Sequence, residues 1–170
     1  MNRQLLSIYL NDHLAGAVVG GELAGRLHSS NKDDELGSLI AELIGEIEED
    51  RRSLEGLMER LEFRKDPIKR GAAWLAEKTG RLKLNGRLVG YSPLSRLEEL
   101  EALALGVRAK AALWRALAAV SEGDPEIAAT EPEAMAERAD AQFVKIEAAR
   151  IEAARRAFAS REGQRSEGSA

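Results

Sequence analysis

The chain has 170 residues and a formal net charge of −4, with 44% hydrophobic and 32% charged residues. That length suits one domain with its own core, and that composition excludes disorder over most of the chain. There is no cysteine and there are two histidines, His13 and His28, which excludes disulfides, thiolate metal sites and imidazole-rich metal sites. The aromatic content of 4% favours helices over a β sandwich.

The N-terminal segment does not resemble a targeting signal. Its apolar residues stop at Asn11 after a single basic residue, Arg3, so no continuous apolar core of a signal peptide forms. No apolar run is long enough to span a bilayer. We therefore expect a cytoplasmic protein with no membrane partner.

Two long helices are predicted in the first third of the chain, because apolar residues recur there at intervals of three and four. Their inward positions are, in the first helix, Leu6, Leu10, His13, Ala17, Gly20, Ala24 and Leu27, and in the second, Leu36, Ile40, Leu43, Ile47, Asp50, Leu54, Leu57 and Leu61. Residues 28–32 form a turn, and Asp33 or Asp34 can cap the second helix. Asp50 is the one charged residue at an inward position of that helix.

Residues 64–93 differ from the rest, since glycines interrupt them and basic residues dominate. They begin with a short helix at Asp66-Pro67. A third long helix follows over residues 94–120, capped by Ser92 or Ser95, with Leu97, Leu100, Ala104, Val107, Ala111, Trp114 and Leu117 inward. After a linker, residues 121–130, the last helix covers residues 131–160 with two apolar stripes: Phe143, Ile146, Ala153 and Ala157, then Val144, Ile151 and Phe158.

Loop lengths predict how these helices connect. The short loops make the first and second helices, and the third and fourth, antiparallel hairpins, whereas residues 64–93 are long enough to cross the full length of a bundle. One long crossover between the second and third helices is the ferritin-like arrangement. We expect an all-α, ferritin-like four-helix bundle over residues 1–160, followed by a disordered tail, residues 161–170.

Four segments resemble a known group of proteins: residues 9–16 (YLNDHLAG), 46–50 (EIEED), 74–78 (WLAEK) and 80–86 (GRLKLNG). They are similar to uncharacterised bacterial proteins of the ferritin-like superfamily, over most of residues 5–158. The resemblance implies the fold and leaves the activity open.

Ferritin-like metalloenzymes hold two metals with glutamates and Glu-x-x-His pairs, and this chain has no Glu-x-x-His. One residue from each long helix could still form a divergent site for iron or manganese: His13, Asp50, Glu101 and Glu147. The alternative is structural: Asp50 and His13 form a buried polar pair, while Glu101 and Glu147 pair with arginines such as Arg108, Arg150 or Arg51.

Two surfaces suggest binding. Basic residues of the crossover could hold an anion, namely Lys69, Arg70, Lys78, Arg81, Lys83 and Arg87, although the acidic second helix could neutralise them and nucleic acid is not favoured. The small residues of the first helix could form a homodimer face or pack within the bundle: Gly16, Gly20, Gly21, Ala24 and Gly25.

No catalytic residue is predicted, because nucleophile and nucleotide-binding motifs are missing and His28 lies in a helix-end turn. The leading hypothesis is a non-catalytic bundle without a cofactor that acts through protein interaction or self-association. A divergent di-metal protein or oxidoreductase is the first alternative, and an anion-binding module is the second.

Overall fold

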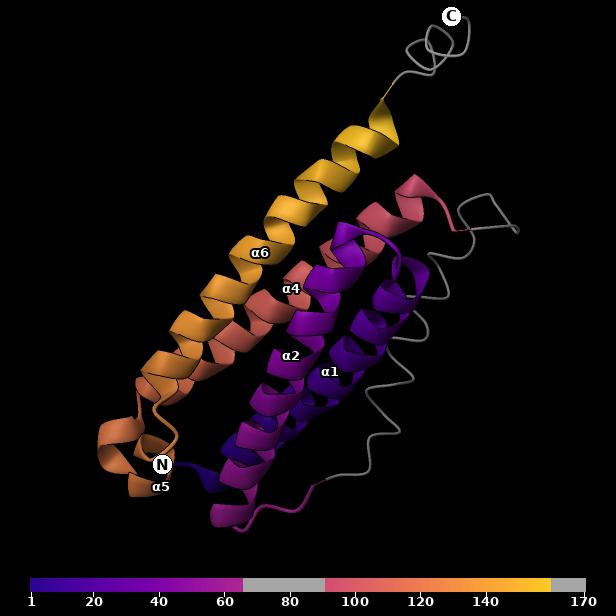
Figure 1. Cartoon of the computed structure of the whole chain (residues 1–170). Helices are drawn as coiled ribbons and strands as arrows, with labels where there is room; N and C mark the ends of the chain where they lie inside the picture. The colour runs from indigo at the N-terminus through magenta and orange to yellow at the C-terminus, as the bar shows by residue number, and fades with distance from the viewer. Residues whose placement is uncertain (66–90, 160–170) are drawn as a thin grey trace, which may run out of the picture.

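The computed structural model describes residues 1–65 and 91–159, and their regular structure is entirely helical. The described residues form four long helices, with a small helical corner between the last two (Figure 1). The elements are α1 (Arg3–Ser30), α2 (Glu35–Arg60), α4 (Pro93–Ala118), a 3₁₀ turn (Ser121–Gly123), α5 (Pro125–Ala128) and α6 (Pro132–Phe158). The all-α prediction is confirmed for this part of the chain.

The predicted caps form at the helix starts. The Asp34 side chain accepts a hydrogen bond from the backbone N–H of Gly37 at 3.1 Å, and Ser92 accepts one from Ser95 at 3.1 Å. Gly37 also allows the α1–α2 turn to close, since a Cβ there would collide with the backbone carbonyl of Asn31. His28 lies at this turn, where its Nδ1 is 2.9 Å from the carbonyl oxygen of Gly37.

The helices form two hairpins, α1 with α2 and α4 with α6, and the hairpins meet mainly where α1 packs on α4. The two ends of the connection between the hairpins lie at opposite ends of the bundle. Asn11, in the first half of α1, donates a hydrogen bond to the carbonyl of Arg64 at 3.1 Å. Tyr91 accepts one from Asn31, at the far end of α1, at 2.9 Å. The helices on either side of that connection, α2 and α4, therefore run in the same direction (Figure 1).

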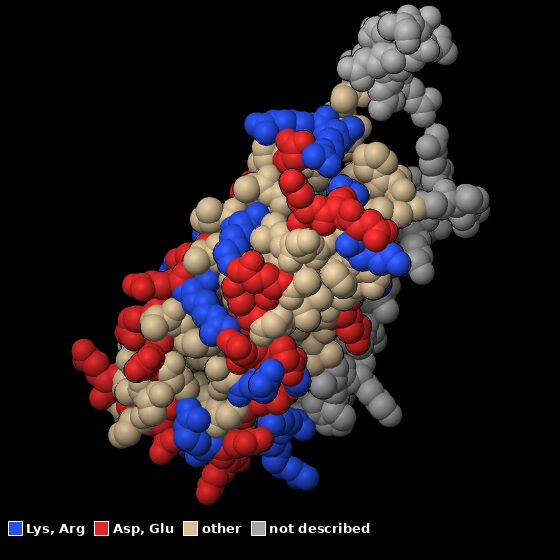
Figure 2. Space-filling view, in the orientation of Figure 1, with Lys and Arg blue, Asp and Glu red and all other residues tan. Residues whose placement is uncertain are grey.

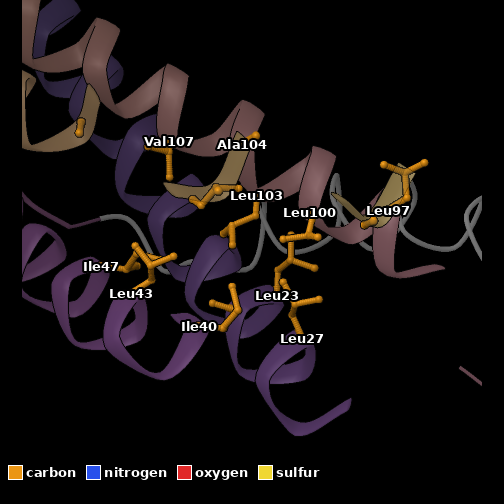
Figure 3. Packing of buried hydrophobic residues seen from close by; sticks show 14 of the residues in the cluster. Leu23, Leu27, Ile40, Leu43, Ile47, Leu97, Leu100, Leu103, Ala104 and Val107 are labelled. Atoms are coloured by element: carbon orange, nitrogen blue, oxygen red, sulfur yellow. The ribbon is translucent and has the colours of Figure 1, made fainter. Parts of the chain in front are cut away.

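The core consists of two apolar clusters, one toward each end of the bundle. In the first, leucines and isoleucines of α1, α2 and α4 point toward one another (Figure 3). Trp114 is the largest buried side chain of the second, whose other members include Leu10, Leu57 and Ile127.

The inward positions predicted for α2 and α4 are confirmed with one exception, Leu36, which is only partly buried. In α1 the prediction is wrong in part. Leu14, Val19 and Leu23 are buried, whereas four of the predicted positions are only partly buried: Leu6, His13, Ala17 and Gly20. The inward face of α1 therefore shifts around the helix along its length. The second stripe of α6 is exposed, and the linker holds a buried residue, Ile127, on the short α5.

Membrane crossing finds no support in the described helices. Over residues 1–65 and 91–159 none of them is both long enough and apolar enough to cross a bilayer.

Candidate functional site

The most unusual chemical feature of the bundle is a charged layer between the two apolar clusters. Asp50 lies on the inward face of α2, between Ile47 and Leu54, and only 4% of its surface is exposed. A carboxylate at such a depth is unfavourable unless cations and hydrogen-bond donors compensate for its lost hydration.

Three side chains from the second hairpin provide that compensation. The ammonium group of Lys110, on α4, donates a hydrogen bond to Asp50 Oδ2 and another to the amide oxygen of Gln142, on α6. The amide nitrogen of Gln142 also donates to Asp50 Oδ2 at 3.1 Å. On the other side, the guanidinium Nε of Arg138 lies 3.2 Å from Asp50 Oδ1. Asp50, Lys110, Gln142 and Arg138, together the central polar layer, thus connect α2, α4 and α6.

Burial changes the acid–base properties of the basic partner. It lowers the pKa of Lys110, because the charged ammonium loses hydration, and the neighbouring Asp50 carboxylate partly reverses that effect. The two groups form a buried ion pair, whose attraction offsets the cost of desolvation only while both partners stay in place.

Long polar side chains also bridge the outer edge between α2 and α6, where these helices approach each other less closely than α4 and α6 do. Lys145 contacts Glu42 at 2.7 Å and Glu46 at 3.1 Å. Arg138 reaches the carbonyl oxygen of Glu46 at 3.0 Å and the carboxylate of Glu49 at 2.8 Å. One side of the bundle is consequently closed by charge pairs rather than by apolar packing.

The predicted pairing of His13 with Asp50 is wrong, since Asp50 has the partners named above. His13 packs edge-on against the ring of Tyr9, with ring centres 4.6 Å apart. Burial lowers the pKa of His13, against the opposing effect of the Asp12 carboxylate. The uncharged imidazole is therefore favoured, and its role in the fold is apolar packing.

Glu101 and Glu147 lie away from the central polar layer and share one arginine. The Arg150 side chain contacts Glu147 at 2.7 Å and Glu101 at 3.7 Å, which links α6 to α4. This confirms the structural alternative for these two glutamates. Glu101 is 60% exposed, as expected for a surface ion pair.

The four residues proposed as metal ligands are thus not brought together. Among the described residues, no group of three or more His, Cys, Asp and Glu side chains lies in an arrangement that could hold a metal ion. The chemistry at Asp50 leads to the same reading, because two cationic side chains and an amide already lie against its carboxylate. These partners do not fit a di-metal centre, which needs several free carboxylate oxygens.

A second polar group closes the end of the bundle near the α1–α2 turn. The amide of Asn31, 3% exposed, donates to the backbone carbonyl of Leu27 and to the hydroxyl of Tyr91. Burial raises the pKa of Tyr91 to about 12, and burial also raises the pKa of Glu99, with which the Tyr91 hydroxyl interacts. These groups hold the start of α4 against the end of α1.

Of the two predicted binding surfaces, the structure describes only the small-residue face of α1. The six basic residues proposed for anion binding lie within residues 66–90, outside the described part of the chain. The glycines of α1 are described, and their packing within the bundle is looser than expected. No described atom lies within 4 Å of a Cβ built at Gly16, Gly20, Gly21 or Gly25, apart from the helix itself and adjacent residues.

Lys110 and Gln142 were missed by sequence reasoning, although the signal was the one that singled out Asp50. Lys110 follows the inward Val107 by three residues, and Gln142 precedes the inward Ile146 by four. Each is a polar residue beside an apolar stripe. Position along the helix alone, however, does not show whether a long side chain turns inward or reaches solvent.

Compared with models of protein families, with curated proteins and with solved structures, the chain matches none. Its function therefore has to be argued from its own residues.

Proposed function

We propose that this chain is a non-catalytic bundle of the ferritin-like type that acts by binding a partner protein or a second copy of itself. One observation carries the proposal: the centre of the bundle is filled by a closed set of charge pairs. The Lys110 ammonium and the Arg138 guanidinium lie against Asp50, where a metal-dependent bundle would need free carboxylates.

The topology supports the ferritin-like part of the proposal. Two antiparallel hairpins follow each other so that α2 and α4 are parallel, and the described ends of their connection, Arg64 and Tyr91, lie toward opposite ends of the bundle. Bundles with a single long crossover of this kind include the ferritin-like folds.

The interaction part of the proposal rests on what the surface exposes. Several large apolar side chains of the long helices remain in solvent, among them Leu105 on α4 and Val144 on α6, each 66% exposed. Apolar side chains that recur on one helix face, with polar residues around them, are typical of interaction surfaces. The glycine face of α1 is a second candidate for self-association, since alanine-sized space remains above it among the described residues.

Metal analysis of the purified protein distinguishes this proposal from the divergent metalloprotein. The protein is loaded with iron, manganese or zinc, dialysed and measured for bound metal. We expect no stoichiometric metal in the natural protein and no difference in Asp50→Ala. Near-stoichiometric metal that is lost in Asp50→Ala while that variant stays helical by circular dichroism, but retained in the exposed-carboxylate control Asp33→Ala, would establish the metalloprotein instead.

The anion-binding alternative has a separate test. Binding of DNA, RNA and heparin is measured at low and high salt, because contacts with phosphates or sulfates weaken steeply as salt rises. We expect weak binding to all three polyanions. Tight, salt-sensitive binding that is lost when Lys69, Arg70 and Arg81 are changed to glutamine would favour that alternative.

A further inference from the structure

The outward face of α6 carries a regular stripe of exposed residues, which we name the outer stripe. Its members alternate at intervals of four and three, and every one is exposed: Glu137, Ala141, Val144, Ala148, Ile151, Arg155 and Phe158. A 4-3 spacing that repeats every seven residues is the pattern with which one helix packs along another in a coiled coil. Nothing in the described part of the chain covers this stripe.

The stripe is apolar at its centre, where Val144 is 66% and Ile151 38% exposed, with small alanines beside them. Leu105, also 66% exposed, adds to this surface from α4. It lies between Glu101 and Arg108, whose side chains both contact α6. Leu105 therefore lies on the side of α4 that borders α6.

The charges at the two ends of the stripe are opposite. Glu137, near the start, has no ion pair among the described residues, whereas Arg155, near the end, has only a surface contact of 3.5 Å with Glu152. Figure 2 shows the same trend, with acidic side chains along the lower left edge, where α6 begins, and basic side chains at the upper end, where it finishes.

This order of residues makes the stripe complementary to itself. When a second α6 is laid antiparallel, with the two-fold axis at residue 146, Val144 faces Ala148 of the other copy and Glu137 faces Arg155. The apolar centres then meet, and each acidic end meets a basic end. A face that pairs with an identical copy in this way is what a two-fold symmetric dimer requires.

We infer that the chain forms a homodimer in which the α6 helices pack antiparallel through their outer stripes. This rests on the proposed function and names the partner as a second copy of the chain. The area of this face is sufficient for a dimer. The 27 residues of α6 make it about 40 Å long, and α4 beside it brings its width to about 20 Å, so it offers roughly 800 Å² per copy. A specific dimer of ordinary size buries about that much on each partner.

Sedimentation velocity at micromolar concentrations tests the inference. The natural protein is expected to sediment as a dimer and Val144→Asp as a folded monomer, because the substitution puts two carboxylates into the apolar centre. Leu5→Asp is the matched control, since Leu5 is 63% exposed on α1 and lies off the stripe. A monomeric natural protein, or a dimer that survives Val144→Asp, would overturn the inference.

Charge reversal tests the antiparallel arrangement itself. Glu137→Arg and Arg155→Glu are each expected to weaken dimerisation about tenfold, because the symmetry applies every change twice, and the double variant is expected to restore it. Arg52→Glu is the same charge reversal at an exposed position of α2, and it should leave dimerisation unchanged. A double variant as weak as the single ones would contradict this pairing.

These outcomes are independent of the metal analysis. A monomeric natural protein that binds no metal would end the dimer inference while leaving the proposed interaction with another protein intact. A dimer that also binds stoichiometric metal would support the dimer inference and contradict the proposed non-catalytic bundle without a metal.

Discussion

Removal of the Lys110 ammonium should destabilise the bundle far more than the loss of a surface charge. In Lys110→Met the aliphatic stem remains, but Asp50, 4% exposed, keeps only Gln142 and Arg138, at 3.1 and 3.2 Å. Breaking one partner out of a buried ion pair costs about 3–5 kcal/mol. Because Arg138 still compensates part of the charge, we expect the lower end of that range, about 3 kcal/mol.

Urea unfolding followed by circular dichroism measures this change. With a denaturant dependence of about 1–3 kcal/mol per molar, a loss of about 3 kcal/mol lowers the midpoint by roughly 1–3 M. In thermal unfolding it lowers the melting temperature by roughly 6–12 °C for a chain of this size. The matched control, Arg52→Met, removes a cation that is 66% exposed on α2, away from the outer stripe, and should cost less than about 1 kcal/mol.

The double variant Asp50→Leu with Lys110→Met separates a lost charge partner from lost packing. Replacing both ions with apolar groups of similar size should recover most of the stability, because no uncompensated carboxylate remains in the core. The reasoning is refuted if Lys110→Met costs no more than Arg52→Met. It is also refuted if the double variant loses more free energy of unfolding than the two single variants lose together.

Three further outcomes are expected. Gly20→Ala should raise the free energy of unfolding by up to about 1 kcal/mol, since alanine favours a helix and no described neighbour obstructs its Cβ. Gly37→Ala should lower the free energy of unfolding, because its Cβ would collide with the Asn31 carbonyl. Urea unfolding of the two variants checks both signs. Because the pKa of His13 is lowered in the folded state, its contribution to stability is present above pH 6.5 and is lost as pH falls through the folded-state pKa. His13→Leu should therefore reduce the acid sensitivity of the melting temperature between pH 7 and pH 5. An unchanged pH profile of the melting temperature would count against this. The raised pKa of Glu99 gives a pH dependence of the opposite sign, because its contribution to stability is present below pH 4.5 and is lost as pH rises. Glu99→Gln should therefore be more stable than the natural protein at neutral pH. An equal change in stability at pH 4 and at pH 7 would argue against this.

The helices could be predicted because their signals are local. The 4-3 spacing identified the buried residues from Ile40 to Leu61 except Met58, and Asp34 and Ser92 act as the expected caps. Such signals depend on neighbours within one or two turns, which the sequence itself places at fixed distances. The same reasoning weakened in α1, where glycines and small apolar residues surround the helix and leave no single preferred face.

The candidate site was half predictable. The spacing showed that Asp50 is inward, but it gave no means of choosing its partners from residues 60 to 92 positions away. The same spacing places His13 at an inward position of the first helix and so predicts it as the partner. In the structure, Lys110 and Gln142 contact the carboxylate because their long side chains span the wider separation between α2 and the helices of the second hairpin.

Periodicity and loop lengths were enough to predict the helical class, the helix boundaries to within a few residues, the two hairpins and the need for a buried partner at Asp50. The packing of the helices was needed to see which groups meet Asp50, that Glu101 and Glu147 share Arg150, and that the outer stripe of α6 stays exposed. The physical reason is that periodicity fixes the direction of a side chain around its own helix. The rotation and height of one helix against another depend on the packing of all of them together.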